Sequence, residues 1–183
     1  MRSEIIKPAL TLLLICLVST LVLSITNSIT SEKIIETEKK QAETARQKVL
    51  PKADHFELIG DDEGNEVYAG KDASGELVGY TVAVNDKSYG GDIRVMTGMD
   101  VDMKVTGISI LTINDTPGLG MNAKKDSFLD QYTDKTAGSA VCSKNASGDE
   151  IQAITGATRT TEAVTRCVNA AGNAVKNLTE GGN

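Results

Sequence analysis

The segment with the clearest capacity for chemistry reads Ile154-Thr155-Gly156-Ala157-Thr158-Arg159-Thr160-Thr161 and leads into a predicted helix. Free backbone N–H groups and the positive end of the helix dipole make a helix start favourable for a phosphate, and Arg159 adds a countercharge. The Gly156–Ala157 pair has little side-chain bulk, so Thr158 would be reachable by a modifying enzyme. The alternative is an ordinary helix cap, in which Thr158 or Thr160 bonds a free backbone amide.

Few other residue sets in the chain could carry catalysis. The chain contains one His and three Cys, whereas the common zinc, non-haem iron and iron–sulfur sites use several imidazoles or thiolates. The sequence has no Gly-x-Ser-x-Gly, no Cys-x-x-Cys, no P-loop and no dinucleotide fingerprint. We therefore predict no metal site and no complete active site, so that any dinucleotide is bound by a partner.

The charge balance argues against nucleic acid as a partner. The whole chain has a formal net charge of −6. The residues after Leu50 include 12 bases and 20 acids, a balance of −8. Such a domain would repel phosphate backbones rather than collect them.

The N-terminus carries a predicted membrane span. Residues 9–25 are apolar except for hydroxyl groups, and continuing to residue 29 gives the ~20 residues that a bilayer requires. Arg2 and Lys7 precede the span, and no base follows it before Lys33, which favours a cytoplasmic N-terminus and an extracytoplasmic domain. A cleaved signal peptide is the alternative, although no A-x-A-like site follows the run. We expect a cytoplasmic N-terminus at residues 1–8 and an anchor at residues 9–29.

The next segment, residues 30–51, is predicted to be a helical stalk. It has no Gly or internal Pro, and Ile35, Ala42, Ala45 and Val49 share one helical face. Ser31 could cap this helix, and Pro51 would end it. A helix that packs against a partner is the alternative to a solvated stalk.

Beyond the stalk the hydrophobic period changes to that of strands. Alternation predicts strands at residues 78–84, 93–99 and 104–113, weaker strands at 56–59 and 67–69 around a turn at 60–65, and helices at 124–132 and 160–178. Strands first and helices later indicate an α+β fold with an antiparallel or mixed sheet. We assign this domain to residues 52–179 and a disordered tail to residues 180–183.

Two motifs resemble signatures of the family of FMN-binding domains. Thr155-Gly156-Ala157-Thr158 resembles the site at which a flavin transferase joins FMN, through its phosphate, to the final Thr. Asn114-Asp115-Thr116-Pro117-Gly118-Leu119-Gly120 resembles the loop that lies against the flavin, and the likeness extends over about residues 75–178. Three residues depart from the family pattern: Gln152 stands where Asp is common, Asp115 where Glu is common, and Ile113 where His is common.

The resemblance implies FMN attached covalently to Thr158 as the cofactor. It also implies a flavin site built from Thr155, Gly156, Ala157, Arg159, Thr160, Asp115, Thr116, Gly118, Leu119, Tyr89 and Gly90. A single span, a stalk and one FMN domain most resemble the G subunit of the Rnf complex, an ion-translocating oxidoreductase that connects ferredoxin and NAD. The implied function is electron transport within the membrane, with the other membrane and peripheral subunits and a flavin transferase as partners.

Three other functions remain open at this point. One is a component like the C subunit of the sodium-translocating NADH:quinone reductase, which has the same plan. Another is an exported binding or assembly module without flavin, and the third is a separate extracytoplasmic flavin reductase. A disulfide between Cys142 and Cys167 is also open in an exported domain.

Overall fold

The computed structural model describes residues 2–180, except for the side chains of residues 2–5 and 32. The chain divides into two compact units, Met1–Gln41 and Ala42–Asn183. Most of the expected disordered tail, residues 181–183, lies outside the described residues, whereas Glu180 is the last residue of a helix.

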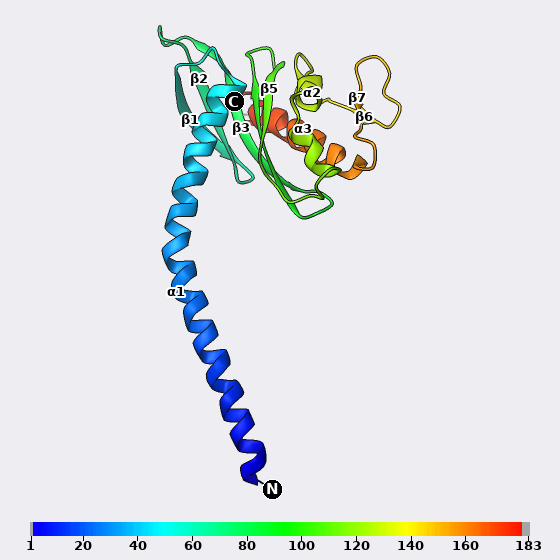
Figure 1. The fold of residues 1–183 in the computed structure, drawn as a ribbon. Helices are drawn as coiled ribbons and strands as arrows, with labels where there is room; N and C mark the ends of the chain where they lie inside the picture. Colours follow the sequence, from blue (N-terminus) through cyan, green and yellow to red (C-terminus); the bar gives the residue numbers. More distant parts are fainter. Residues whose placement is uncertain (1, 181–183) are drawn as a thin grey trace. The chain divides into compact units, whose positions relative to one another are not determined.

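The first unit is helical. It belongs to α1 (Arg2–Val49), which runs without interruption through the expected anchor and stalk (Figure 1). Among the described residues, α1 is the one helix long and apolar enough to cross a membrane. Thr11, Thr20 and Thr26 each donate a hydrogen bond to the carbonyl four residues earlier, which satisfies their hydroxyl groups within the helix. Ser31 is not the cap of a separate stalk helix, because the backbone before it is already helical.

The second unit is built on an antiparallel sheet of five strands in sequence order. They are β1 (His55–Asp62), β2 (Asn65–Lys71), β3 (Leu77–Lys87), β4 (Asp92–Met99) and β5 (Val105–Ile113) (Figure 1). The predicted α+β class is confirmed, and of the two sheet types that the sequence left open, antiparallel and mixed, this sheet is antiparallel.

The turn expected at residues 60–65 is shorter than predicted. Strands β1 and β2 continue to Asp62 and from Asn65, so that only Glu63 and Gly64 connect them. Both residues have positive φ, 54° and 87°, which is the backbone of a tight two-residue hairpin. Asp61 accepts a hydrogen bond from the Gly64 amide at 2.9 Å and so stabilises the turn.

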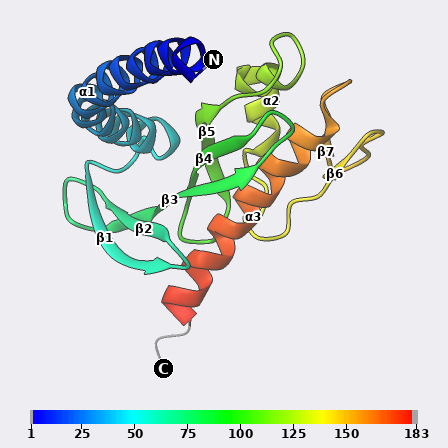
Figure 2. The same cartoon turned by 90° about the horizontal axis from the view of Figure 1, so that it is seen from below.

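One face of the sheet is covered by α3 (Thr158–Glu180), as Figure 2 shows. Its apolar stripe packs with inward residues of the strands into one core, whose fully buried members include Val82, Ile93, Val95, Val164, Cys167 and Val168. This helix begins two residues before the predicted start, so Thr158 belongs to its first turn.

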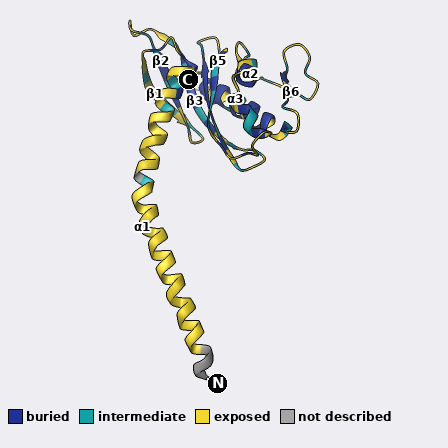
Figure 3. Cartoon of the chain, in the orientation of Figure 1, coloured by how far each residue is buried: buried dark blue, intermediate teal, exposed yellow. Residues whose placement is uncertain are grey.

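The opposite face is covered by residues 42–50, which the sequence assigned to the stalk. Ala45 and Val49 form a second buried cluster with Met96 of β4. Figure 3 shows that α1 is exposed along most of its length and that the buried residues gather in the second unit. The Thr106 hydroxyl donates to the Val49 carbonyl at 2.5 Å, and the Arg46 guanidinium lies 3.6 Å from the centre of the Tyr68 ring. The compact unit therefore begins before the expected domain boundary at residue 52.

The connection between β5 and α3 is irregular. The helix expected at 124–132 is divided into η1 (Gly120–Lys124), α2 (Asp126–Leu129) and η2 (Asp130–Tyr132). Two short parallel strands, β6 (Cys142–Ser143) and β7 (Ile151–Gln152), follow and were not predicted. Cys142 and Cys167 are both free thiols, so the disulfide considered from the sequence is absent.

Candidate functional site

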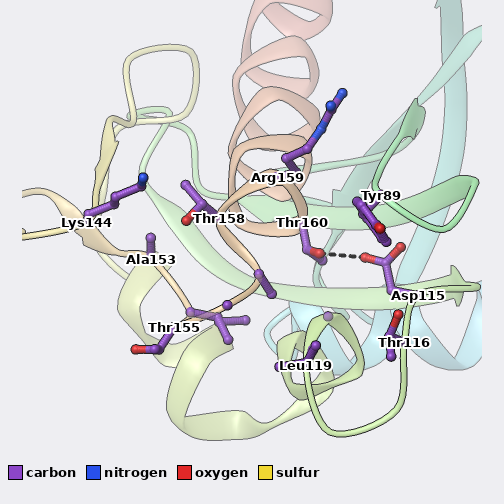
Figure 4. A pocket seen from close by; sticks show the side chains of 14 residues that line it. Tyr89, Asp115, Thr116, Leu119, Lys144, Ala153, Thr155, Thr158, Arg159 and Thr160 are labelled. Carbon is purple, nitrogen blue, oxygen red and sulfur yellow. Dashed lines mark hydrogen bonds between the residues drawn. The ribbon is translucent and has the colours of Figure 1, made fainter.

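A cavity of about 750 Å³ opens where four segments meet (Figure 4). The β3–β4 turn, the loop after β5, the β6–β7 connection and the start of α3 supply its walls. Its lining consists of Tyr89, Asp115, Thr116, Leu119, Gly120, Lys144, Ala153, Ile154, Thr155, Gly156, Ala157, Thr158, Arg159 and Thr160. Ten of the twelve residues expected from the sequence lie here, whereas Gly90 and Gly118 are not part of the lining.

The first turn of α3 presents Thr158 to this cavity. The Ile154 carbonyl accepts from the Ala157 amide at 2.9 Å, and the Thr161 hydroxyl accepts from the Ile154 amide at 3.1 Å. Gly156 makes the bend between them with a φ of +78°. Within residues 2–180, the half-buried Thr158 hydroxyl has no hydrogen-bond partner. The helix-cap alternative for Thr158 is therefore wrong, and its oxygen is available for chemistry.

Asp115 connects three walls of the cavity. Its carboxylate accepts hydrogen bonds from the Ser88 hydroxyl at 2.5 Å, from the Gly90 amide, and from the Thr160 hydroxyl at 2.5 Å. The bond to Thr160 is the dashed line in Figure 4. Thr160 is thus tied to a carboxylate and is not a helix cap. Burial raises the pKa of Asp115, but these hydrogen bonds outweigh it and hold the pKa below its ordinary value.

Gly120 is required beside this carboxylate. A Cβ atom at residue 120 would lie 2.5 Å from the Asp115 Oδ2 and 2.7 Å from the Thr160 Oγ1. Any side chain would therefore separate the two groups whose hydrogen bond joins the β5 loop to α3. The lack of a side chain at residue 120 is therefore explained by its packing against Asp115 and Thr160.

Two large side chains border the mouth of the cavity. Tyr89 is 73% exposed and Leu119 is 44% exposed, unusual values for residues that line a cavity. Leu119 also lies against the bend before α3, since a Cβ at Gly156 would be 3.1 Å from its Cδ2. An aromatic face and an aliphatic side chain suit a flat ring that is partly open to solvent.

Two cations lie in the lining, Arg159 and Lys144. No ion pair or side-chain hydrogen bond engages either of them in the described part of the chain. The sequence singled out Arg159 but missed Lys144, which sits in a polar loop with no motif around it. With Asp115 as the one acid, the lining carries a net positive charge inside an acidic domain.

Ile113 and Gln152 lie outside the lining. Ile113 is 6% exposed and belongs to the main core, so it faces the hydrophobic interior and not the cavity. Gln152 is exposed on β7, where its side chain binds the backbone of the neighbouring loop.

The dimensions and chemistry of the cavity fit FMN. Ligand pockets commonly have volumes of ~300–1,000 Å³, and this one combines an apolar lining with a free hydroxyl and two cations. Thr158 would hold the phosphate, while Tyr89 and Leu119 would border the ring.

Comparison with known proteins defines the class. Residues 88–173 match the FMN-binding domain family, and residues 1–49 match the RnfG N-terminal region. The chain therefore has an FMN-binding domain behind a membrane-associated N-terminal segment.

The particular family follows from full-length relatives. The chain is 37% identical to the G subunit of the Na⁺-translocating ferredoxin:NAD⁺ oxidoreductase complex of Acetobacterium woodii, over 96% of this chain and 94% of the relative. It is 33% identical to the G subunit of the proton-translocating ferredoxin:NAD⁺ oxidoreductase complex of Clostridium ljungdahlii, over 91% and 89%. The chain belongs to the RnfG family, the G subunits of the Rnf ion-translocating oxidoreductase complexes.

Solved structures support the fold. NqrC of Shewanella oneidensis superposes with a TM-score of 0.54 at 20% identity, over 63% of this chain and 59% of that one. The C subunit of the Na⁺-translocating NADH-quinone reductase from Parabacteroides distasonis gives 0.58 at 15% identity, over 79% and 96%. At these identities the likeness concerns the fold alone, so it does not favour the quinone reductase as the function.

Proposed function

We propose that this chain is the flavoprotein subunit of an Rnf-type complex and carries electrons between ferredoxin and NAD through FMN attached covalently to Thr158. The observation that carries this proposal is the Thr158 hydroxyl, which is unpartnered among the described residues and lies in a cavity that Lys144 and Arg159 also line. A hydroxyl that forms no bond within the protein can accept a phosphoryl group without loss of a structural contact.

The residues of the cavity have distinct parts in this function. When bound, FMN supplies one-electron and two-electron transfer. Thr158 would hold the phosphate, and Arg159 would offset its charge. Asp115 keeps the three walls together, and Tyr89 and Leu119 leave one side of the cavity open, which an electron carrier needs for contact with its redox partners.

The other parts of the proposal concern placement. Helix α1 would anchor the chain in the cell membrane with its N-terminus in the cytoplasm, and the flavin domain would lie on the extracytoplasmic side. The distribution of Arg2, Lys7 and Lys33 around the span supports this orientation. A covalent bond would prevent loss of the flavin outside the cytoplasm. The remaining subunits of the complex and a flavin transferase would be the partners.

Complementation tests the function directly. Membranes from cells that lack this chain should regain ferredoxin-dependent NAD⁺ reduction when the wild type is supplied. Thr158→Val should restore assembly of the complex but not the reaction, because only the attachment atom is removed. Co-purification of the other subunits with Thr158→Val separates the expected loss of the reaction from simple instability. Full activity with Thr158→Val would contradict the proposal.

A further inference from the structure

Lys144 is a cation of the cavity that belongs to none of the sequence motifs. It lies between β6 and β7, and its side chain enters the cavity from the wall opposite Tyr89 and Asp115, on the side where Thr158 lies (Figure 4). An isolated surface lysine would be a solvated charge with no preferred position. The backbone around Lys144, however, is fixed.

The side chain of Gln152 holds this loop through both ends of its amide. Its Nε2 donates to the Lys144 carbonyl at 2.7 Å, and its Oε1 accepts from the Ala146 amide at 3.1 Å. The Gln152 backbone amide donates in turn to the Gln131 side chain at 2.8 Å. A carboxylate at residue 152 could accept from Ala146 but could not donate to the Lys144 carbonyl. The amide is thus specifically suited to keep Lys144 at the cavity.

The net positive charge of the cavity lining indicates that Lys144 binds an anion. The lining has two cations with no acidic partner among the described residues, and its carboxylate, Asp115, is satisfied by three hydrogen bonds. An anion that enters at Thr158 would therefore lie on the side of the cavity where the Lys144 side chain enters from the β6–β7 loop (Figure 4). The phosphate of free FMN is a monoester with two negative charges, and as a diester on Thr158 it would keep one, so Lys144 has a charge to offset in either form.

We propose that Lys144 recognises the phosphate of the flavin nucleotide and that Gln152 is the positioning residue that keeps Lys144 there. This inference rests on the proposed function, because it assumes that the cavity takes FMN. It adds a phosphate-binding residue outside the Thr-Gly-Ala-Thr segment and gives Gln152 a defined part.

The test compares FMN with riboflavin, which has the same ring and no phosphate. The full chain is purified in detergent from cells without the flavin transferase, so that Thr158 is unmodified, and dissociation constants are measured by quenching of flavin fluorescence. Lys144→Gln should weaken FMN binding about tenfold, the size expected for one charge-assisted hydrogen bond. Riboflavin binding should not change. The matched control is Lys125→Gln, an exposed lysine outside the cavity, which should leave both constants unchanged.

Gln152 is tested by a double-mutant cycle. Gln152→Met removes both loop hydrogen bonds without a change of charge and should reduce the preference for FMN over riboflavin. In the Lys144→Gln background the same substitution should have no further effect on that preference, because Gln152 acts through Lys144. A purely structural role would weaken both flavins equally in both backgrounds.

The part of Lys144, the part of Gln152 and the proposed function are contradicted by different results. An unchanged ratio of FMN to riboflavin affinity in Lys144→Gln, or a wild type that binds both flavins equally, would overturn the inference. Additive effects of Gln152→Met in the two backgrounds would overturn the part assigned to Gln152. The proposed function fails on a different observation, the absence of flavin on wild-type chain from cells that contain the transferase.

Discussion

At the scale of single residues, Asp115 determines the geometry of the site. Asp115 is 5% exposed, and its carboxylate joins the β3–β4 turn to the start of α3 through Ser88, Gly90 and Thr160. These hydrogen bonds favour the ionised form, so the pKa in the folded state lies below the value in the unfolded chain. The ionised carboxylate therefore stabilises the fold above the unfolded pKa, and this contribution is lost as the pH falls through the folded pKa.

Asp115→Asn should lower the free energy of unfolding at pH 7 by about 2 kcal/mol, the worth of hydrogen bonds to a charged group. As the pH falls below the ordinary aspartate pKa of about 4, the difference between variant and wild type should shrink, because the unfolded wild-type chain then binds a proton that the folded carboxylate, with its lower pKa, does not yet bind. Urea unfolding of the full chain in detergent at pH 7 and pH 3 measures both values. Asp130→Asn, at an exposed position, is the control. Equal stabilities at pH 7, or a difference that persists unchanged at pH 3, would refute this account of Asp115.

Residue types predicted part of the site. Thr158 and Arg159 could be predicted as site residues because a loop of small residues before a helix start favours the binding of a phosphate. Lys144 could not be selected, because a lysine in a polar loop is ordinary and its approach to the cavity depends on the hydrogen bonds of Gln152. Asp115 was expected beside the flavin, but its three hydrogen bonds depend on the spatial meeting of segments far apart in the sequence.

At the scale of elements, strands with alternating residues were predictable and irregular segments were not. The pattern of Val78, Tyr80, Val82 and Val84 identified β3 because one face of that strand is buried. Strands β6 and β7 are only two residues each, too short for any period to appear. The separation of residues 120–132 into three short helices likewise follows from tertiary packing around buried Ala123, Phe128 and Tyr132.

Two paired glycines on the sheet face under residues 42–50 should differ in how well they tolerate a side chain. Gly98 and Gly107 are neighbours on β4 and β5. A Cβ at Gly98 would lie 2.4 Å from the Val49 carbonyl oxygen, whereas a Cβ at Gly107 would be 3.4 Å from the nearest atom, the Val49 Cα. Gly98→Ala should therefore destabilise the domain by about 1–3 kcal/mol, and Gly107→Ala by clearly less. Thermal unfolding of both variants measures the difference, and equal melting temperatures would show that Val49 does not pack as described.

At the scale of the whole molecule, the boundary of the folded unit differs from the one that composition suggests. Pro51 ends the helical pattern, which placed the domain start at residue 52. Val49 and Leu50 are each 1% exposed, so these side chains belong to the interior of the second unit. Sequence periodicity shows that the end of this helix has a narrow apolar face. It cannot tell whether that face is buried against the sheet of the same chain or against a partner protein.

Two truncated chains test this boundary. Residues 42–183 should fold cooperatively and stay soluble without detergent. Residues 52–183 should lose several kcal/mol of stability, since burial of each Val or Leu side chain contributes about 1.5–3 kcal/mol, and Met96 would become exposed. Thermal unfolding followed by circular dichroism compares the two. Equal melting temperatures would place the boundary after Pro51 and contradict the packing of residues 42–50.

In-gel fluorescence detects the covalent flavin that we propose on Thr158. Native membranes are separated on a denaturing gel and viewed under ultraviolet light before staining, with Thr158→Val beside the wild type. We expect a fluorescent band near 19 kDa that survives denaturation in the wild type and is absent from the variant. A wild-type chain without fluorescence, from cells that contain the flavin transferase, or a band that persists in Thr158→Val, would contradict this proposal.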